Sequence, residues 1–324
     1  KVHILIFSPS LKVVEKINAQ LSLIGSLKGD GRPVLGLDAK ELAKIVLGAS
    51  ENCLIVGAHL MTPWFSLFGS RSGFDSLEEC FEDYSRHIYA GETGLSADPA
   101  MLWRIPDGRR IALISNSDAH SPQKIGREAN VFDAELNYFS IIKAIKRKDP
   151  REFLYTIEFY PEEGKYHYDG HRSCRLSFSP AETRRHNGLC PRCGRPLTIG
   201  VLNRVEQLAD KPVGFRPKGA VPFKSLVPLA EIIAEAFGIG SGTVQVEKEY
   251  KKLIKEFDSE FNILLAVKRE ELEKFTLPEV AEGVIRAREG RVIRDPGYDG
   301  VYGKIRVFSE REKKIFSGRQ GVLF

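Results

Sequence analysis

The 324-residue sequence lacks any long apolar run. No stretch approaches the roughly 20 consecutive apolar residues that a helix needs to cross a bilayer. No secretory signal is visible either. These two absences argue against a membrane partner and favour a cytoplasmic protein.

Cysteine is scarce. The chain has five cysteines, an odd number, and two of them form a Cys-x-x-Cys pair, Cys190 and Cys193. An odd count with such a pair argues against a disulfide framework and favours a reducing compartment and a bound metal. The glycine-rich segment 296–305 lacks the GxxxxGK[ST] order, so it is not a phosphate-binding loop.

The composition is that of an ordinary globular protein. Hydrophobic residues make up 42% and charged residues 28%, and the net charge is +5. A chain of this length can bury the cores of two or three domains. The first 150 residues alternate short apolar segments with amphipathic ones, which predicts an α/β fold with a parallel sheet closed into a barrel.

The most informative stretch is residues 111–130. An apolar run from Ile111 to Ile114 predicts a buried strand, and Asp118 and His120 follow it one residue apart. A carboxylate and an imidazole at this spacing lie on one side of the chain and can bind one cation. An Asp-x-His sequence also arises by chance on surface loops, so this segment needs support from elsewhere.

Two other predicted strands carry a histidine. His59 ends the apolar run 53–60, and His3 lies in the apolar run 2–7. A single such histidine is more often a hydrogen-bonded core residue than a ligand. Three of them suggest a shared site, because catalytic residues collect at the carboxyl ends of strands in α/β barrels.

A second metal site is predicted downstream. His171-x2-Cys174 and Cys190-x2-Cys193 are separated by fifteen residues. Two ligand pairs at this spacing are typical of a tetrahedral structural Zn²⁺ site. His167 or His186 could replace His171 as the fourth ligand. A zinc ion there would make the folding of this small module dependent on metal.

The region around this motif is strongly basic. Residues 164–224 contain twelve Lys or Arg and four Asp or Glu, an excess of eight positive charges. Arginines held on a rigid module can contact successive phosphates of a nucleic acid, although a merely solvated basic face is the alternative. The expected DNA contacts are Lys165, His167, Arg172, Arg175, Arg184, Arg185, Arg192 and Arg195.

Beyond residue 223 the sequence becomes mainly helical, with amphipathic segments at 226–238, 246–257 and 278–290. The expected divisions are a first domain at 1–150, a zinc-binding basic module at 151–215, a mainly helical domain at 216–310 and a tail at 311–324. In that tail Gln320, Leu323 and Phe324 resemble the Gln-x-x-Leu-Phe peptide by which bacterial proteins dock on the DNA sliding clamp. A pentapeptide of this kind is also easily matched by chance.

The motifs together resemble a known family. His3 in VHILIF, GAH ending at His59 and SDAH ending at His120 are similar to metal-binding motifs of the polymerase and histidinol phosphatase (PHP) superfamily. The fuller stretches GAHLMTPWFSLFGS, ETGLSAD, NSDAHSP, EGKYHYDGHR and CPRCG resemble its endonuclease Q branch. The resemblance implies a distorted (β/α)7 barrel, then a zinc ribbon and a helical domain. The family's opening His-x-His pair is absent, so we expect that the natural protein has a further N-terminal segment.

The resemblance also implies a function. We expect a metal-dependent DNA repair endonuclease that incises the phosphodiester 5′ to a deaminated base (hypoxanthine, uracil or xanthine) or to an abasic site. His3, His59, Asp118 and His120 would hold part of a cluster of two or three divalent metals (Zn²⁺, Mn²⁺ or Mg²⁺). Thr62, Trp64 and Glu92 are candidate pocket residues, with Trp64 equally able to be core. Alternatives are a phosphoesterase acting on small phosphorylated metabolites and a non-catalytic DNA- or clamp-binding protein. The expected partner is damaged DNA, near the nucleoid.

Overall fold

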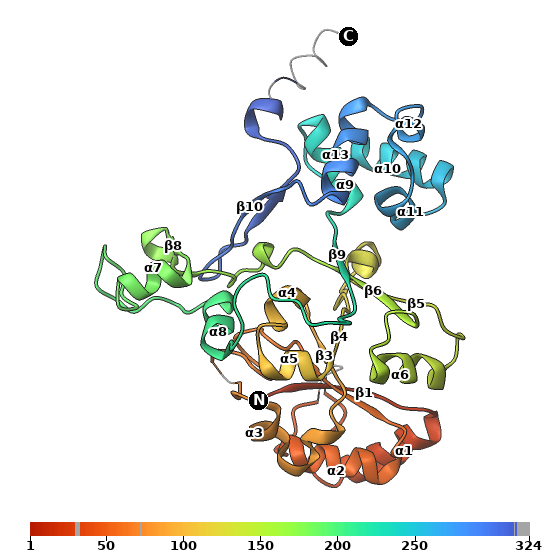
Figure 1. Ribbon diagram of the computed structural model, residues 1–324, viewed down its shortest axis with the longest axis vertical. Helices are drawn as coiled ribbons and strands as arrows, with labels where there is room; N and C mark the ends of the chain where they lie inside the picture. The colour runs from red at the N-terminus through yellow and green to blue at the C-terminus, as the bar shows by residue number, and fades with distance from the viewer. Residues whose placement is uncertain (30–32, 72, 314, 316–324) are drawn as a thin grey trace.

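The computed structural model describes residues 1–29, 33–71, 73–313 and 315. It is an α/β structure with a sheet-containing half and a mainly helical carboxyl-terminal part (Figure 1). The proposed clamp-binding residues Gln320, Leu323 and Phe324 lie outside the described residues.

The first sheet has four strands in the order β1-β2-β3-β4: β1 (His3–Phe7), β2 (Leu54–Ala58), β3 (Ala90–Glu92) and β4 (Ala112–Ile114). β2, β3 and β4 are parallel, as predicted. The expectation of a wholly parallel sheet was wrong for β1, which runs antiparallel to β2. This reversal places the start of β1, with His3, beside the end of β2, because His3 pairs with Ala58.

Helices cover the first sheet, and several begin with the capping residues that the sequence supplies. Ser10 and Ser76 accept backbone hydrogen bonds at the starts of α1 and α3, and Asp98 does so at α4, which also has a proline in its first turn. Apolar side chains of these helices pack on the sheet and are largely buried there. The helices are α1 (Leu11–Leu21), α2 (Ala39–Ala49), α3 (Leu77–Phe81), α4 (Pro99–Leu102) and α5 (Pro106–Arg110).

A second sheet, in the order β5-β6-β9, adjoins the first. Its strands are β5 (Ala129–Phe132), β6 (Phe153–Glu158) and β9 (Phe223–Ser225), with α6 (Tyr138–Arg147) between β5 and β6. Ser115 after β4 donates a hydrogen bond to the carbonyl oxygen of Ile157 in β6, 2.6 Å away. Phe153 packs in one core with residues of β2 and β4. Among the described residues the two sheets are separate ladders, so closure into a barrel stays a prediction.

A small module follows β6. It contains the two-stranded sheet of β7 (Asp169–His171) and β8 (Leu176–Phe178), then α7 (Pro180–Arg185). α7 begins with a capping box between Ser179 and Glu182. α8 (Val201–Leu208) returns the chain to the first region, where Val201 and Val205 join the core beneath the first sheet.

The helices of the carboxyl-terminal part share a core with Ile305 of β11 and with Ile157 of β6 in the second sheet. Gly238 ends α9 in the left-handed conformation (φ +67°), which glycine adopts without strain. The elements are α9 (Leu229–Phe237), α10 (Val244–Phe257), α11 (Glu260–Leu265), α12 (Arg269–Leu272), α13 (Pro278–Arg288), β10 (Ile293–Asp295) and β11 (Lys304–Arg306). The three amphipathic segments predicted here as helices are confirmed.

Candidate functional site

His3 and His59 meet at one edge of the first sheet. His59 directly follows β2, and the antiparallel pairing of β1 brings His3 opposite the end of that strand. The two imidazole rings have their centroids 6.1 Å apart and lie edge to face. The ring of Phe65 stacks on His3 at 5.8 Å, and its carbonyl oxygen accepts a hydrogen bond from the His3 backbone N–H. Phe65 has a positive φ of 60°, so the loop that carries it is tightly folded over His3.

Asp118 reaches the same edge from β4. Its Oδ2 lies 3.7 Å from Nε2 of His59. Two atoms that each bind one cation at about 2.0–2.2 Å are separated by roughly 3–4 Å in a tetrahedral or octahedral shell. The separation of these two atoms therefore fits a shared cation. Asp118 has a positive φ of 44°, and the loop is held by Arg127, which donates two hydrogen bonds to the carbonyl oxygen of Ser117.

The carboxylate of Glu92 contacts the other imidazole nitrogen of His59, Nδ1. Its Oε2 is 2.5 Å from Nδ1, and its Oε1 accepts a hydrogen bond from the side chain of Asn116. Glu92 is only 2% exposed. A carboxylate on one imidazole nitrogen fixes the ring orientation and leaves the other nitrogen available for metal. The sequence suggested Glu92 as a substrate contact; the structure places it behind His59.

His120 is exposed, and its Nδ1 lies 2.8 Å from the carbonyl oxygen of its neighbour Asp118. Among the described residues, no three of His3, His59, Asp118 and His120 have ligand atoms all within 4.8 Å of one another. The structure brings His3, His59 and Asp118 together at one end of the sheet as a loose set, and His120 lies two residues beyond Asp118. Their roles as metal ligands stay predictions.

Two buried glutamates behind this set were not found from the sequence. Burial raises the pKa of Glu158 to about 8, although hydrogen bonds from Thr156 and Thr93 oppose that rise. Burial, and then repulsion from Glu158, raise the pKa of Glu128 well above its usual value. The signal available in the sequence was a carboxylate at the end of an apolar strand, Glu158 after Phe153, the same pattern that marked His59.

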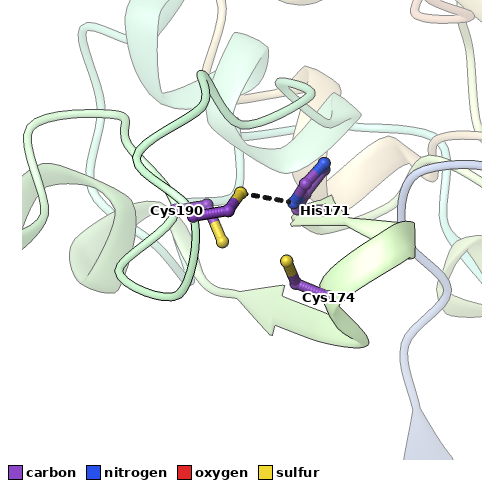
Figure 2. Close-up of side chains that lie close together, drawn as sticks. His171, Cys174 and Cys190 are labelled. Carbon is purple, nitrogen blue, oxygen red and sulfur yellow. Dashed lines mark hydrogen bonds between the residues drawn. The ribbon is translucent and has the colours of Figure 1, made fainter.

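The His/Cys cluster is compact. His171, Cys174, Cys190 and Cys193 each offer a ligand atom, and these atoms all lie within 4.8 Å of one another. Figure 2 shows the side chains of His171, Cys174 and Cys190 pointing toward a common centre. His171 Nδ1 and Cys193 Sγ are 3.3 Å apart. This donor set matches the tetrahedral N/S coordination that Zn²⁺ prefers.

Backbone turns shape the cluster. The backbone N–H of Gly194 donates to the carbonyl oxygen of Cys190, and Gly194 has a φ of +73°, a conformation that glycine adopts without strain. Burial alone would raise the pKa of Cys190, but hydrogen bonds from the backbone of Arg192 and from His171 lower it to about 6. Cys190 is therefore mainly thiolate at neutral pH, the form that binds metal.

The two alternative zinc ligands lie elsewhere. His186 is exposed and stacks on Phe178, and His167 is 5% exposed and stacks on Tyr168. Neither is part of the compact group. The ring of His167 is enclosed, and this burial lowers its pKa, which favours the neutral form. Its predicted contact with DNA is therefore corrected: an enclosed side chain cannot reach a phosphate.

The arginines predicted to contact DNA are all exposed: Arg172, Arg175, Arg184, Arg185, Arg192 and Arg195. Among the described residues, no carboxylate lies within 4.0 Å of their guanidinium groups. Arg192 also donates to the carbonyl oxygen of Cys174 across the cluster. Lys165 is exposed as well and lies over the ring of Tyr302, 4.4 Å from its centroid.

The two candidate pocket residues, Thr62 and Trp64, lie on the loop after His59. Trp64 is 40% exposed, so the core alternative is excluded, and its ring packs edge to face on Tyr166 at 5.0 Å. Thr62 is half-buried, with its hydroxyl 3.4 Å from that of Ser96. Two neighbouring residues of this loop therefore make separate ring contacts, Phe65 with His3 and Trp64 with Tyr166.

Comparisons with known proteins agree with these observations. Residues 228–291 match the family model described as the MJ0043 C-terminal domain. The uncharacterized protein MJ0043 of Methanocaldococcus jannaschii is 35% identical over 268 residues, covering 80% of this chain but only 32% of that protein. The chain therefore spans about a third of MJ0043. The uncharacterized protein YqxK of Bacillus subtilis is 29% identical over 314 residues, covering 94% of this chain and 74% of that protein.

Two solved structures are similar over nearly the whole chain. The lesion-specific endonuclease PfuEndoQ of Pyrococcus furiosus superposes with a TM-score of 0.85 and 33% identity, covering 95% of this chain and 76% of that one. Endonuclease Q in complex with a 27-mer duplex bearing an abasic lesion at its active site superposes with a TM-score of 0.84 and 32% identity. This match covers 97% of this chain and 78% of that one. None of the helices that the structure describes is long and apolar enough to cross a membrane.

Proposed function

Because this chain belongs to the endonuclease Q family, we propose that it is a DNA repair endonuclease that cuts the phosphodiester bond 5′ to a deaminated base or an abasic site. The observation that carries the proposal is the approach of His59 and Asp118, 3.7 Å apart at one sheet edge, with Glu92 behind the imidazole. The solved complex of endonuclease Q with an abasic duplex supports the choice of substrate class.

The chemistry follows from these side chains. Divalent cations bound at this edge would lower the pKa of a water molecule and stabilise the charge that develops on the phosphate. Nε2 of His59 and the carboxylate of Asp118 would bind one cation, with His3 and His120 as further ligands. Glu92 holds the His59 ring so that Nε2 faces Asp118.

The compact His/Cys cluster would contribute to DNA binding. With Zn²⁺ held by His171, Cys174, Cys190 and Cys193, the module becomes a rigid ribbon that presents its six exposed arginines and Lys165 to the DNA backbone. The duplex would lie along the aromatic contacts between the two sites. The lesion nucleotide would leave the base stack and enter a pocket near Thr62 and Trp64.

The larger organisation is part of the same proposal. Residues 1–150 would belong to a PHP-type distorted barrel, with β6 and β9 packing beside it, and 151–215 to the zinc module. Residues 216–310 form the mainly helical domain, and 311–324 would be a tail. The last five residues would dock on the sliding clamp. A protein that repairs DNA in this way would be located in the cytoplasm, at the nucleoid.

The test is cleavage of duplexes that contain hypoxanthine, uracil or an abasic site, by the natural protein that contains these 324 residues. Asp118→Ala should lower the rate by roughly a hundredfold or more, since it removes a proposed metal ligand. Asp133→Ala is the matched control, because Asp133 is an exposed aspartate directly after β5, outside the strand-end set. Equal cutting by both variants, or hydrolysis of free phosphate monoesters alone, would end the proposal.

A further inference from the structure

A cavity lies at the opposite end of β4 from Asp118. Its volume is about 210 Å³, and Ile111 and Ala112, where β4 begins, form part of its wall. The rest of the wall comes from Pro99 and Trp103 of the α4 region, the ends of α5 and α6, Thr156 of β6 and the segment 217–221 before β9. The strand-end set follows the other terminus of β4, so the two sites do not share residues.

The wall of this cavity has one sign of charge. Four cationic side chains line it, Arg109, Arg147, Lys148 and Lys218, and no carboxylate is among its lining residues. Arg216 adds a fifth cation nearby, over the ring of the lining residue Trp103 at 5.7 Å. Walls that carry one sign of charge raise the local concentration of ligands of the opposite sign.

Nearby carboxylates neutralise only part of this charge. Asp210 pairs with Arg109 through two contacts of 2.7 Å, and Glu152 lies 3.8 Å from Arg147. Lys148 donates to the neutral carbonyl oxygens of Arg109 and Arg110, and among the described residues no carboxylate lies within 4.0 Å of its ammonium group. In the part of the chain that the structure describes, no carboxylate lies within 4.0 Å of the Lys218 ammonium.

The environment of Lys148 shows the imbalance. Burial and then repulsion from Arg110 lower the pKa of its ammonium group. Both effects would be relieved by an anion in the cavity, because an opposite charge favours the protonated amine. Apolar side chains also line the cavity, among them Leu113, Pro217 and Val221.

We propose that this cavity binds a small phosphate-bearing ligand, held by Lys218, Lys148 and Arg147. The volume is below the roughly 300 Å³ at which pockets for drug-sized molecules begin. The cavity therefore takes inorganic phosphate, or the phosphate end of a mononucleotide whose remainder lies against the apolar side. The inference does not depend on the proposed nuclease activity.

The test is equilibrium binding by calorimetry to the natural protein, with inorganic phosphate, AMP and adenosine as probes. Phosphate and AMP should bind saturably and adenosine should not. AMP binding tighter than phosphate would identify a nucleotide as the preferred source of the anion, and equal binding would identify free phosphate. Lys218→Glu should weaken binding by at least about tenfold, because it removes a charge-assisted contact and adds repulsion.

Lys12→Glu is the matched control: Lys12 is exposed on α1, and the charge change is identical. It should leave binding unchanged. The proposal is overturned by absence of saturable binding, by adenosine binding as tightly as AMP, or by equal losses in the two variants. Loss of binding in Asp118→Ala with retention in Lys218→Glu would place the anion at the strand-end set and would also overturn it. Competitive displacement of AMP by undamaged duplex would assign the cavity to the DNA surface instead.

Discussion

The two candidate metal sites differ in how they are built. The His/Cys cluster draws all its ligands from residues 171–193, and its ligand atoms lie within 4.8 Å of one another. The strand-end set draws on residues from β1, β2 and β4, about 115 positions apart in sequence, and stays looser and more exposed. A local site is organised by its own turns, whereas a distributed one depends on sheet pairing and on buried groups behind it.

The comparison predicts its largest effect at the compact cluster. Cys190→Ser should abolish zinc binding and unfold the module, since structural zinc in finger peptides contributes about 10–16 kcal/mol of apparent binding free energy. Metal analysis and protease sensitivity near residues 171–193 measure this. Cys80→Ala is the control, because Cys80 is a buried core thiol outside the cluster. Zinc retained by Cys190→Ser would show that the four ligands do not share one ion.

The strand-end region should be sensitive to pH instead. Burial raises the pKa of Glu158 to about 8, whereas an unfolded glutamate has a pKa near 4.3. The folded protein keeps a proton that the unfolded chain releases between these values, so the free energy of unfolding falls as pH rises through this window. In Glu158→Gln, the decrease in the free energy of unfolding across this pH window should be smaller by a few kcal/mol. Urea denaturation at several pH values measures it.

Glu15→Gln provides the comparison for this measurement, because Glu15 is exposed on α1 and both substitutions remove one carboxylate. Its unfolding curve should keep the pH dependence of the unsubstituted protein. The same slope in both variants would show that Glu158 is ionised in the folded state.

A smaller effect is expected behind His59. Glu92→Gln removes the carboxylate from Nδ1, and loss of such a partner typically costs about 10–100-fold in metal affinity or activity. The measurement is the concentration of divalent metal needed for half-maximal cleavage. Glu41→Gln, on α2, is the control. A rate loss that added metal does not restore would indicate that Glu92 acts on substrate, as the sequence had suggested.

The smallest effect is expected on the surface of the zinc module. Arg195→Ala should weaken DNA binding equally for damaged and undamaged duplexes and lower the salt slope of log Kd by about 0.9, the value for one phosphate contact. Titrations at several salt concentrations measure this slope. Lys12→Ala should leave it unchanged, and a loss confined to damaged DNA would assign Arg195 to lesion recognition.

Particular residues show why some predictions held and others did not. The ligand pairs of the His/Cys cluster were visible because each pair lies within one turn of chain. His167 lies only four residues before His171 and has the same side-chain chemistry, yet it is buried beside Tyr168. Glu158 was missed, and the contact of Glu92 with His59 was not foreseen, because their partners Thr93 and His59 follow other strands.

The sequence by itself determined the alternation of strands and helices, the spacing of the residues in the His/Cys cluster and the basic character of the module, because these properties depend on neighbours in the chain. Only the tertiary structure decided that β1 runs antiparallel to β2, which carries His3 to His59. It alone decided that Glu92 faces His59 and that a cationic cavity lies at the other end of β4. These features arise where strands distant in sequence pair and pack, and hydrophobic periodicity does not specify that pairing.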